Sequence, residues 1–416
     1  MLLQGGNIYM SLIVQKFGGT SVADTHHIFN VAKKATELYK QGNDIIIVVS
    51  AQGNTTDKLE AMALEISPEK PKREMDVLLS VGEQISISLL AMAINKLGFP
   101  AVSLTGWQAG IITSPEHSDA KIIKIDTHRI NEELKHKNIV IVAGFQGIDE
   151  NGNITTLGRG GSDTSAVAIA SAMQADVCKI YTDVDGVYTA DPRIVMSAKK
   201  WSVLSYDEMI ELADAGAQVL NKKSIMTARE SGINVEVLSS MTNQENGTVV
   251  KKMQTRHNSA ASGVALDNSI VKVLISDMQT PDGFYSTILP KLRESNIPVD
   301  TSHQLMGTLP PNSVEFLTDE QHLKEAVAII EEALKNDTSH KVFYDQNLAK
   351  ISVINLSESL NINIASIIFE ALSEAEIRIY MVACHECKVS VLVAKNQAHK
   401  AMNMIHSKIF EEDKII

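Results

Sequence analysis

The segment Thr155–Ser165 carries the residues best suited to chemistry. It is a polar, glycine-rich loop with Arg159 and Asp163, and it leads directly into the small apolar stretch Ala166–Ala172, which is typical of a buried helix. Free amides at a helix N-terminus bind anions, and a guanidinium matches a carboxylate with paired hydrogen bonds. The pattern therefore predicts capture of an anionic metabolite beside a phosphate, with a simple capped turn as the alternative.

Two further polar loops follow predicted strands. Lys16–Ser21 reads Lys-Phe-Gly-Gly-Thr-Ser, in which two glycines allow close approach of the backbone and the lysine adds a point charge. That composition suits a nucleotide triphosphate, although it is not a Walker A loop. Ser50–Asp57 is rich in hydroxyl groups. Each of these loops also fits an ordinary turn or helix cap.

Acidic residues mark two other candidate positions. Glu83 interrupts an apolar helical pattern, and a buried carboxylate needs a cation such as a substrate ammonium group. A solvent-facing glutamate is the alternative. Tyr181–Arg193 combines aspartates, a glycine and an Asp-Pro turn, which can shape a nucleoside pocket. Calcium binding is disfavoured there because the spacing lacks the glutamate and register of an EF-hand loop.

Composition narrows the class of protein. The 416 residues are 44% hydrophobic, which predicts two or three globular domains. A net charge of -12 argues against nucleic-acid binding. Apolar stretches are strand-sized, well below the ~20 residues of a membrane span, and Met1–Asn7 does not resemble a signal peptide. We therefore expect a cytoplasmic protein with no membrane partner.

The three cysteines are too few for a disulfide framework. Cys384 and Cys387 form a C-x-x-C pair, which is half of a zinc site or a redox pair. A complete zinc site needs two more ligands, or a second copy across a dimer axis. The alternative is a turn between strands at 378–382 and 388–394.

Short apolar strands alternate with helical patterns up to about residue 245. This βαβ rhythm predicts an α/β fold with a largely parallel, covered sheet, in which ligands sit at the carboxyl ends of the strands. The expected strands are 12–15, 44–50, 101–104, 139–143 and 177–182, with helices around 28–39, over 74–97 and after Ser162.

The last part of the chain contains an internal repeat. Leu292–Asp300 parallels Leu372–Tyr380, and each copy has a strand before it and a strand pair and helix after it. The order is βαββαβ, a ferredoxin-like unit. The expected strands before the copies are 270–276 and 350–356, and the expected later helices are 319–334 and 397–410.

Taken in order, these motifs resemble the aspartate kinases over nearly the whole chain. The resemblance implies an amino-acid-kinase-type three-layer sandwich followed by two ferredoxin-like ACT modules. The implied divisions are a catalytic domain at 1–245, a linker at 246–262 and ACT modules at 263–340 and 341–416. The matching phrases are 14–22, 73–76, 82–84, 104–110, 142–147, 155–165 and 181–193.

The implied activity is ATP-dependent phosphorylation of the β-carboxylate of L-aspartate, giving 4-phospho-L-aspartate. In the family this opens the pathway to lysine, threonine and methionine, and Mg²⁺ is held mainly through the nucleotide phosphates. By resemblance, Lys16 stabilises the transferring phosphoryl group and Asp163 orients Lys16. Glu83 binds the substrate ammonium group and Arg159 its α-carboxylate. A carboxylate nucleophile is already ionised at pH 7, so no general base is needed.

The remaining implied site residues fall into two sets, and none is expected to ligate a metal directly. The substrate set adds Thr56, Gly160, Gly161 and Ser162. Besides Lys16, the nucleotide set consists of Phe17, Gly18, Gly19, Ser50, Thr182, Asp183, Tyr188, Thr189, Ala190, Asp191, Pro192 and Arg193.

Three departures from the family pattern concern charge and regulation. Gln218 stands where the family often has a lysine near the phosphates, and Lys222 or Lys223 is the candidate replacement. The first module's turn reads Thr280–Phe284, and the second has 358–363 without the usual glycine. Its later strand pair carries Cys384–Cys387 where the family tends to have a Ser/Thr-Ser-Glu run. An amino-acid effector such as lysine or threonine is therefore an open expectation.

Two alternative functions remain. The first is a kinase of the same fold acting on glutamate, carbamate or a nucleotide, which Glu83 together with Arg159 disfavours. The second is a non-catalytic amino-acid sensor or regulatory subunit, which the retention of Lys16 and Asp163 disfavours. Sheet edges in ACT modules commonly pair with a second copy, which predicts a homodimer or larger assembly.

Overall fold

The computed structural model describes residues 11–242, 246–253, 261–279, 282–301, 304–305, 310, 312–356 and 361–410. The chain divides into two compact units. The first contains residues 1–187, 200–213 and 218–255, and the second contains 188–199, 214–217 and 256–416. Parts of the turn expected at Thr280–Phe284 and of the stretch 358–363 lie outside the described residues.

An eight-stranded sheet forms the centre of the first unit, in the order β10-β12-β11-β9-β1-β2-β6-β3. All neighbouring pairs are parallel except β11 with β12, which confirms the predicted largely parallel sheet. The strands are β1 (Leu12–Phe17), β2 (Asp44–Val49), β3 (Ala101–Leu104), β6 (Ile139–Ala143), β9 (Val177–Thr182), β10 (Val203–Ser205), β11 (Val235–Ser239) and β12 (Thr248–Lys251).

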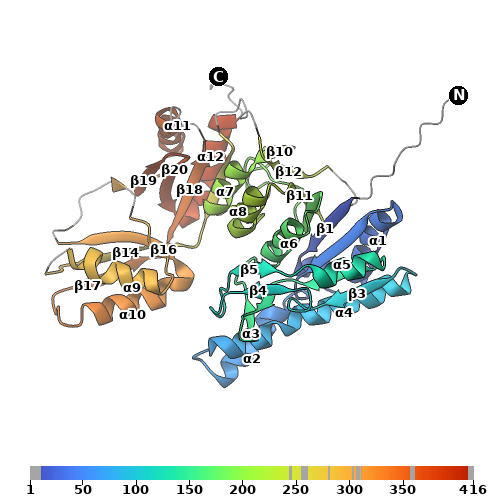
Figure 1. The fold of residues 1–416 in the computed structure, drawn as a ribbon. Helices are drawn as coiled ribbons and strands as arrows, with labels where there is room; N and C mark the ends of the chain where they lie inside the picture. The colour runs from blue at the N-terminus through green and yellow to red at the C-terminus, as the bar shows by residue number, and fades with distance from the viewer. Residues whose placement is uncertain are drawn as a thin grey trace. The chain divides into compact units, whose positions relative to one another are not determined.

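Helices cover both faces of this sheet, so the predicted three-layer sandwich is confirmed (Figure 1). Helices α1 (Thr25–Lys40) and α4 (Val81–Lys96) pack on the face that carries Phe17 and Ile47. Side chains alternate along a strand, so Lys16 points to the opposite face. That face is covered by α6 (Gly161–Ala172), against which α8 (Lys222–Ser231) packs.

A smaller sheet, β5-β4-β7-β8, completes the first unit. Its strands are β4 (Ile111–Thr113), β5 (Ile122–Ile125), β7 (Gln146–Ile148) and β8 (Ile154–Thr156). The other helices are α2 (Thr55–Ile66), α3 (Lys72–Leu79), α5 (His128–Lys135) and α7 (Tyr206–Asp214). Because α3 packs against β8, this sheet links two segments that are far apart in sequence.

The single long helix expected over 74–97 is instead two helices, α3 and α4, interrupted at Ser80. The carbonyl oxygen of Ser80 accepts hydrogen bonds from the side-chain amides of Gln84, at 3.2 Å, and Gln146, at 2.8 Å. Side chains that bind helix carbonyls in this way bend or break a helix. Within the described chain, Lys72–Lys96 is the stretch long and apolar enough to cross a membrane, but half of its most apolar window is buried in the protein.

The second unit contains the two predicted repeats. The first copy consists of β14 (Ile270–Ser276), α9 (Leu289–Glu294), β15 (Gln304–Leu305), β16 (Val314–Asp319), α10 (Leu323–Ala333) and β17 (Lys341–Asp345). The second consists of β18 (Leu348–Ile354), α11 (Asn361–Glu374), β19 (Met381–His385), β20 (Lys388–Ala394) and α12 (Ala398–Phe410). Cys387 lies in the turn between β19 and β20, as the turn interpretation predicts, but Cys384 belongs to β19, which begins at Met381 rather than at 378.

The strands in this unit do not pair only within their own copy of the repeat. The sheet orders are β16-β14-β17 and β13-β18-β20-β19-β15. Strand β13 (Gly263–Asp267) precedes the first copy in the chain but pairs antiparallel with β18 of the second. Strand β17 pairs with β14 of the first copy. A strand from before the first copy therefore extends the sheet of the second.

The segment Tyr188–Lys199 also belongs to the second unit. Thr189 Oγ1 and Nε2 of His406, on α12, lie 2.9 Å apart. The side-chain amide of Asn403, also on α12, donates to the carbonyl of Ile194 at 3.0 Å. Ala190 is buried in the same hydrophobic core. Half of the predicted nucleoside motif is therefore anchored on the last helix of the repeat.

Candidate active site

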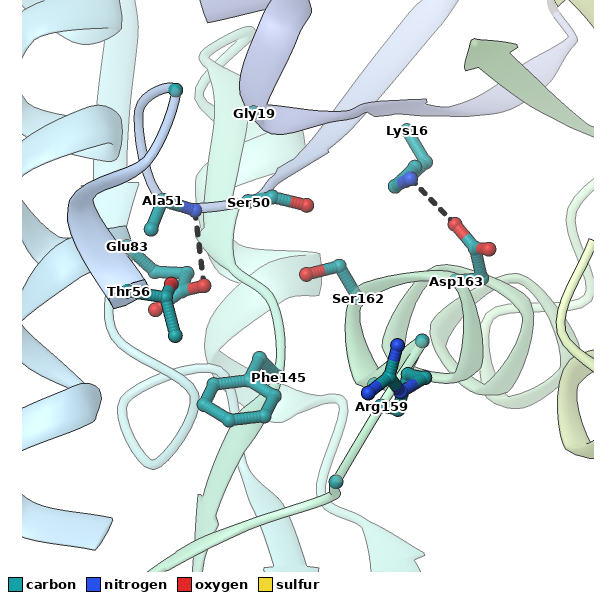
Figure 2. A pocket seen from close by; sticks show the side chains of 14 residues that line it. Lys16, Gly19, Ser50, Ala51, Thr56, Glu83, Phe145, Arg159, Ser162 and Asp163 are labelled. Carbon is teal, nitrogen blue, oxygen red and sulfur yellow. Dashed lines mark hydrogen bonds and ion pairs between the residues drawn. The ribbon is translucent and has the colours of Figure 1, made fainter. Parts of the chain in front are cut away.

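A cleft of about 280 Å³ lies at the carboxyl ends of β1 and β2 and at the N-terminus of α6 (Figure 2). It brings together ten of the residues that the sequence predicts for the site. The lining residues are Lys16, Gly19, Ser50, Ala51, Gly53, Thr56, Glu83, Phe145, Gly158, Arg159, Gly160, Gly161, Ser162 and Asp163.

Lys16 and Asp163 form an ion pair at one side of the cleft. Lys16 Nζ lies 2.6 Å from Asp163 Oδ1, and each side chain is 12% exposed. Lys16 comes from the end of β1, and Asp163 from the first turn of α6. An ion pair with so little solvent around it holds its geometry. The lysine ammonium is thus fixed in place rather than free to sample the surface.

The N-terminus of α6 forms the adjoining wall. Gly160 precedes the helix with φ +72°, a left-handed conformation that glycine adopts without a steric penalty. Gly161, Ser162 and Asp163 then start the helix, and all three line the cleft. The first amides of a helix carry partial positive charge and bind phosphates. Together with Lys16, this wall is suited to an anion with several oxygens.

The loops after β1 and β2 approach each other closely at Gly19. A Cβ atom at Gly19 would lie 2.5 Å from the Ala51 carbonyl oxygen, so only glycine fits without a shift of the backbone. The Gly53 N–H donates to the Gly19 carbonyl at 3.0 Å. This contact places Ser50, Ala51 and Gly53 beside Lys16, where backbone groups can reach a ligand.

Glu83 lies in the first turn of α4 and is only 3% exposed. Its Oε1 accepts a hydrogen bond from the Ala51 N–H at 3.0 Å. Its Oε2 is buried and has no hydrogen-bond partner among the described residues. Burial raises the pKa of Glu83 to about 7, although the Ala51 hydrogen bond lowers it. The site therefore contains a carboxylate oxygen that lacks a cation.

Arg159 lies across the cleft from Glu83 (Figure 2). Its backbone carbonyl accepts a hydrogen bond from Asn221 Nδ2 at 2.9 Å, which ties the loop to α8. A guanidinium facing a carboxylate that needs a cation matches the two charges of an amino-acid main chain. Lys16 and the α6 N-terminus then lie where a side-chain carboxylate and a phosphate would meet.

Phe145 also lines the cleft, and the sequence reasoning assigned it no role. It follows β6 with φ +68°, which is uncommon for an aromatic residue. The Ser165 hydroxyl accepts its N–H at 3.0 Å, and its carbonyl accepts the Leu157 N–H at 2.9 Å. The position of Phe145 shortly after a predicted strand was the available signal. Polar side chains at strand ends indicate a binding site, whereas an aromatic residue there does not by itself.

Comparison with known proteins shows the family to which the chain belongs. The amino acid kinase family model matches residues 11–239, and an ACT domain model matches residues 351–409. An aspartokinase of Bacillus sp. (strain MGA3) is 44% identical, over 95% of this chain and 97% of its own length. Aspartokinase 2 of Bacillus subtilis (strain 168) is 43% identical, over 95% of this chain and 97% of its own. The chain belongs to the aspartokinase family.

A solved structure shows the same fold. The crystal structure of E. coli aspartokinase III in complex with aspartate and ADP has a TM-score of 0.78 to this protein, at 24% identity, and covers 96% of this chain and 100% of its own. The family membership and this fold confirm the predicted combination of an amino-acid-kinase sandwich with a C-terminal ACT region.

The residues that the aspartokinase resemblance assigns to the nucleotide are distributed over both units. Thr182 is the last residue of β9 in the first unit, and its hydroxyl donates to the carboxylate of the next residue, Asp183, at 3.0 Å. Tyr188–Arg193 lies in the second unit. There the side chains of Thr189 and Ala190 are buried, and Asp191 pairs with Arg193 at 2.8 Å. This Arg193 contact lowers the pKa of Asp191.

Lys223, one of the two candidate replacements for the lysine that Gln218 displaces, contacts an aspartate. Lys223 Nζ lies 2.5 Å from Asp119 Oδ1. Neither Lys222 nor Lys223 lines the cleft, and neither does Gln218. The expectation that Lys223 supplies the missing cation near the phosphates is thus not supported by its contacts.

The raised pKa of Glu83 predicts a pH-dependent stability. Glu83 ionises above a pH of 4.5 in the unfolded chain but only above about 7 in the folded protein. The free energy of unfolding should therefore fall as pH rises between these two values. We expect Glu83→Gln to gain stability relative to wild type between pH 5 and pH 8, by on the order of 3 kcal/mol. Urea denaturation at several pH values measures this.

Glu65→Gln, on the exposed surface of α2, is the matched control and is expected to show no such trend. A stability difference between Glu83→Gln and wild type that stays constant from pH 5 to pH 8 would contradict the assignment of a buried, cation-deficient carboxylate.

Proposed function

We propose that the cleft is the catalytic centre and that the protein transfers the γ-phosphoryl group of ATP to the β-carboxylate of L-aspartate. The observation that carries this proposal is the buried Glu83 Oε2, which has no hydrogen-bond partner among the described residues and faces Arg159 across the cleft. A substrate ammonium group supplies the partner that Glu83 Oε2 lacks, and the substrate α-carboxylate binds the arginine. An amino acid held by both ends in this way extends its side chain toward Lys16.

The reaction then requires alignment of the two substrates and neutralisation of charge on the phosphoryl group, rather than a covalent intermediate with the protein. An oxygen of the β-carboxylate attacks the γ-phosphorus, and the bond from that phosphorus to the β–γ bridging oxygen breaks. ADP leaves with the bonding electron pair, and 4-phospho-L-aspartate forms. Lys16 neutralises charge on the transferring group, Asp163 keeps Lys16 in position, and the Ser162 amide at the α6 N-terminus binds a phosphate oxygen.

The cleft residues suit a nucleotide triphosphate, because Gly19, Lys16 and the α6 N-terminus together present backbone amides and a cation. No group of three or more His, Cys, Asp or Glu side chains in the described part of the chain is placed to hold a metal ion. As the family resemblance implies, Mg²⁺ would be bound mainly through the ATP phosphates and would supply further charge neutralisation.

The finer assignments extend this proposal to the rest of the chain. Phe17, Gly18 and Ser50, the Thr182–Asp183 pair and the segment Tyr188–Arg193 bind the nucleotide. The divisions remain a catalytic domain at 1–245, a linker at 246–262 and ACT modules at 263–340 and 341–416. The protein acts in the cytoplasm, and lysine and threonine are the candidate effectors of its ACT region.

An ATP-dependent aspartyl-hydroxamate assay with Mg²⁺ tests the activity. Wild type is expected to form product, and Lys16→Ala to lose at least ~10³-fold in kcat because charge on the transferring group is no longer neutralised. Lys124→Ala, at an exposed position of β5, is the control and should keep full activity. Addition of lysine and threonine, separately, tests the effector assignment.

Well-folded wild-type protein that forms no hydroxamate would contradict the catalytic proposal and favour the amino-acid sensor. A rate of product formation that neither amino acid changes would support the kinase and contradict the effector assignment.

A homodimer is the expected assembly, formed through the second unit. Strand β17 is an edge strand of its sheet, and it exposes Phe343 and Tyr344, at 52% and 57%. An exposed apolar edge commonly pairs with a second copy. Light scattering at micromolar concentration should give a dimer mass, and Phe343→Glu should shift it toward the monomer. A wild-type monomer at that concentration would refute the assembly.

A further inference from the structure

Asp76 is a fully buried carboxylate outside the lining of the cleft, and no function has been assigned to it so far. It lies on α3, and its two oxygens accept hydrogen bonds from four groups. Thr156 Oγ1 donates at 2.6 Å and Thr156 N at 3.2 Å. Ser118 N donates at 3.0 Å, and His117 Nδ1 lies 2.9 Å away.

A buried carboxylate is costly unless fixed donors surround it. Here the donors come from the loop between β4 and β5 and from the end of β8, which are distant in sequence from α3 and from each other. The Ala120 N–H also donates to the Thr156 carbonyl at 2.9 Å. Asp76 therefore holds three separate segments in one rigid joint.

One side of this joint leads to Arg159. Thr156 is the last residue of β8, and the loop that carries Arg159 begins at the next residue. Gly158 in that loop packs directly on the segment that Asp76 holds. A Cβ atom at Gly158 would lie 2.9 Å from Asp119 Oδ1 and 3.1 Å from the Ser118 carbonyl oxygen. Movement of Ser118 or Thr156 would thus displace the Arg159 loop.

The other side of the joint leads to Glu83. The Ser80 N–H donates to the Asp76 carbonyl at 3.1 Å at the end of α3, and α4 starts at the next residue. Glu83 lies in the first turn of α4. The backbone of one residue, Asp76, therefore belongs to the helix that leads into Glu83, while its side chain holds the base of the loop that carries Arg159.

We propose that Asp76 is a positioning residue for the amino-acid site, where its carboxylate fixes the Arg159 loop relative to Glu83. The proposal rests on the amino-acid binding roles given to Glu83 and Arg159 above. Asp76 does not touch the substrate. It determines where the group that binds the α-carboxylate stands relative to the group that binds the ammonium.

Steady-state kinetics of Asp76→Asn and Thr156→Val test this role. Both variants remove part of the joint, and Thr156→Val does so without changing the charge. We expect the KM for aspartate to rise at least ~10-fold, because displacements of about 1 Å at a site cost up to 10²-fold. The KM for ATP should change much less, because the hydrogen bonds of Asp76 and Thr156 do not involve the Lys16–Asp163 ion pair.

Asp149→Asn is the matched control. Asp149 is also buried, at 4% exposed, and accepts hydrogen bonds from Asn151 N and Asn153 N in the turn between β7 and β8. It holds the opposite end of β8 from Thr156, so its loss should lower stability without separating the two KM values. An equal rise of both KM values in Asp76→Asn, or the same aspartate-specific rise in Asp149→Asn, would overturn the proposal.

Hydrogen–deuterium exchange of the intact variants provides a readout that does not depend on turnover. Amides of 157–161 should exchange faster in Asp76→Asn and Thr156→Val than in wild type or Asp149→Asn. Unchanged exchange there would overturn the positioning role even if the wild type forms no phosphoaspartate. If the two variants exchange faster but the wild type forms no phosphoaspartate, the positioning role stands and only the proposed function is contradicted.

Discussion

One electrostatic constraint determines this site: a carboxylate is buried without a cation from the described residues. Glu83 is 3% exposed, and in the described part of the chain only its Oε1 has a hydrogen-bond partner, the Ala51 N–H. Such a group lowers the stability of the free protein at neutral pH. A fold retains a cost of that kind where function uses it, because the missing cation then arrives as part of the ligand.

The other features of the cleft determine which ligand can supply the missing cation. The parallel sheet brings the loops after β1 and β2 to one edge, and Gly19 allows them to approach within contact of each other. The opposite wall is the α6 N-terminus, whose Asp163 holds Lys16. An ammonium site, a carboxylate site and a phosphate site therefore lie around one small cavity, and each is built on a strand end or a helix terminus.

Much of this could be predicted from sequence, because local patterns determine it. The strands Ala101–Leu104, Ile139–Ala143 and Val177–Thr182 have the predicted bounds, and the polar loops predicted after β1 and β2 line the cleft. Non-local contacts were not predictable. The break at Ser80 depends on Gln146, the pairing of β13 depends on β18, and the burial of Thr189 depends on His406. None of these partners is close in sequence, so no periodicity or turn signal reports them.

Calorimetric titration with L-aspartate near pH 7, in buffers of different ionisation enthalpy and with ADP and Mg²⁺ present, tests the central claim most directly. The pKa of Glu83 is about 7, so binding of the ammonium group should release roughly half a proton per site. The measured heat should then depend on the buffer for wild type but not for Glu83→Gln. Succinate, which lacks the ammonium group, should bind far more weakly. Buffer-independent heats in wild type, or succinate binding as tight as aspartate, would contradict the account.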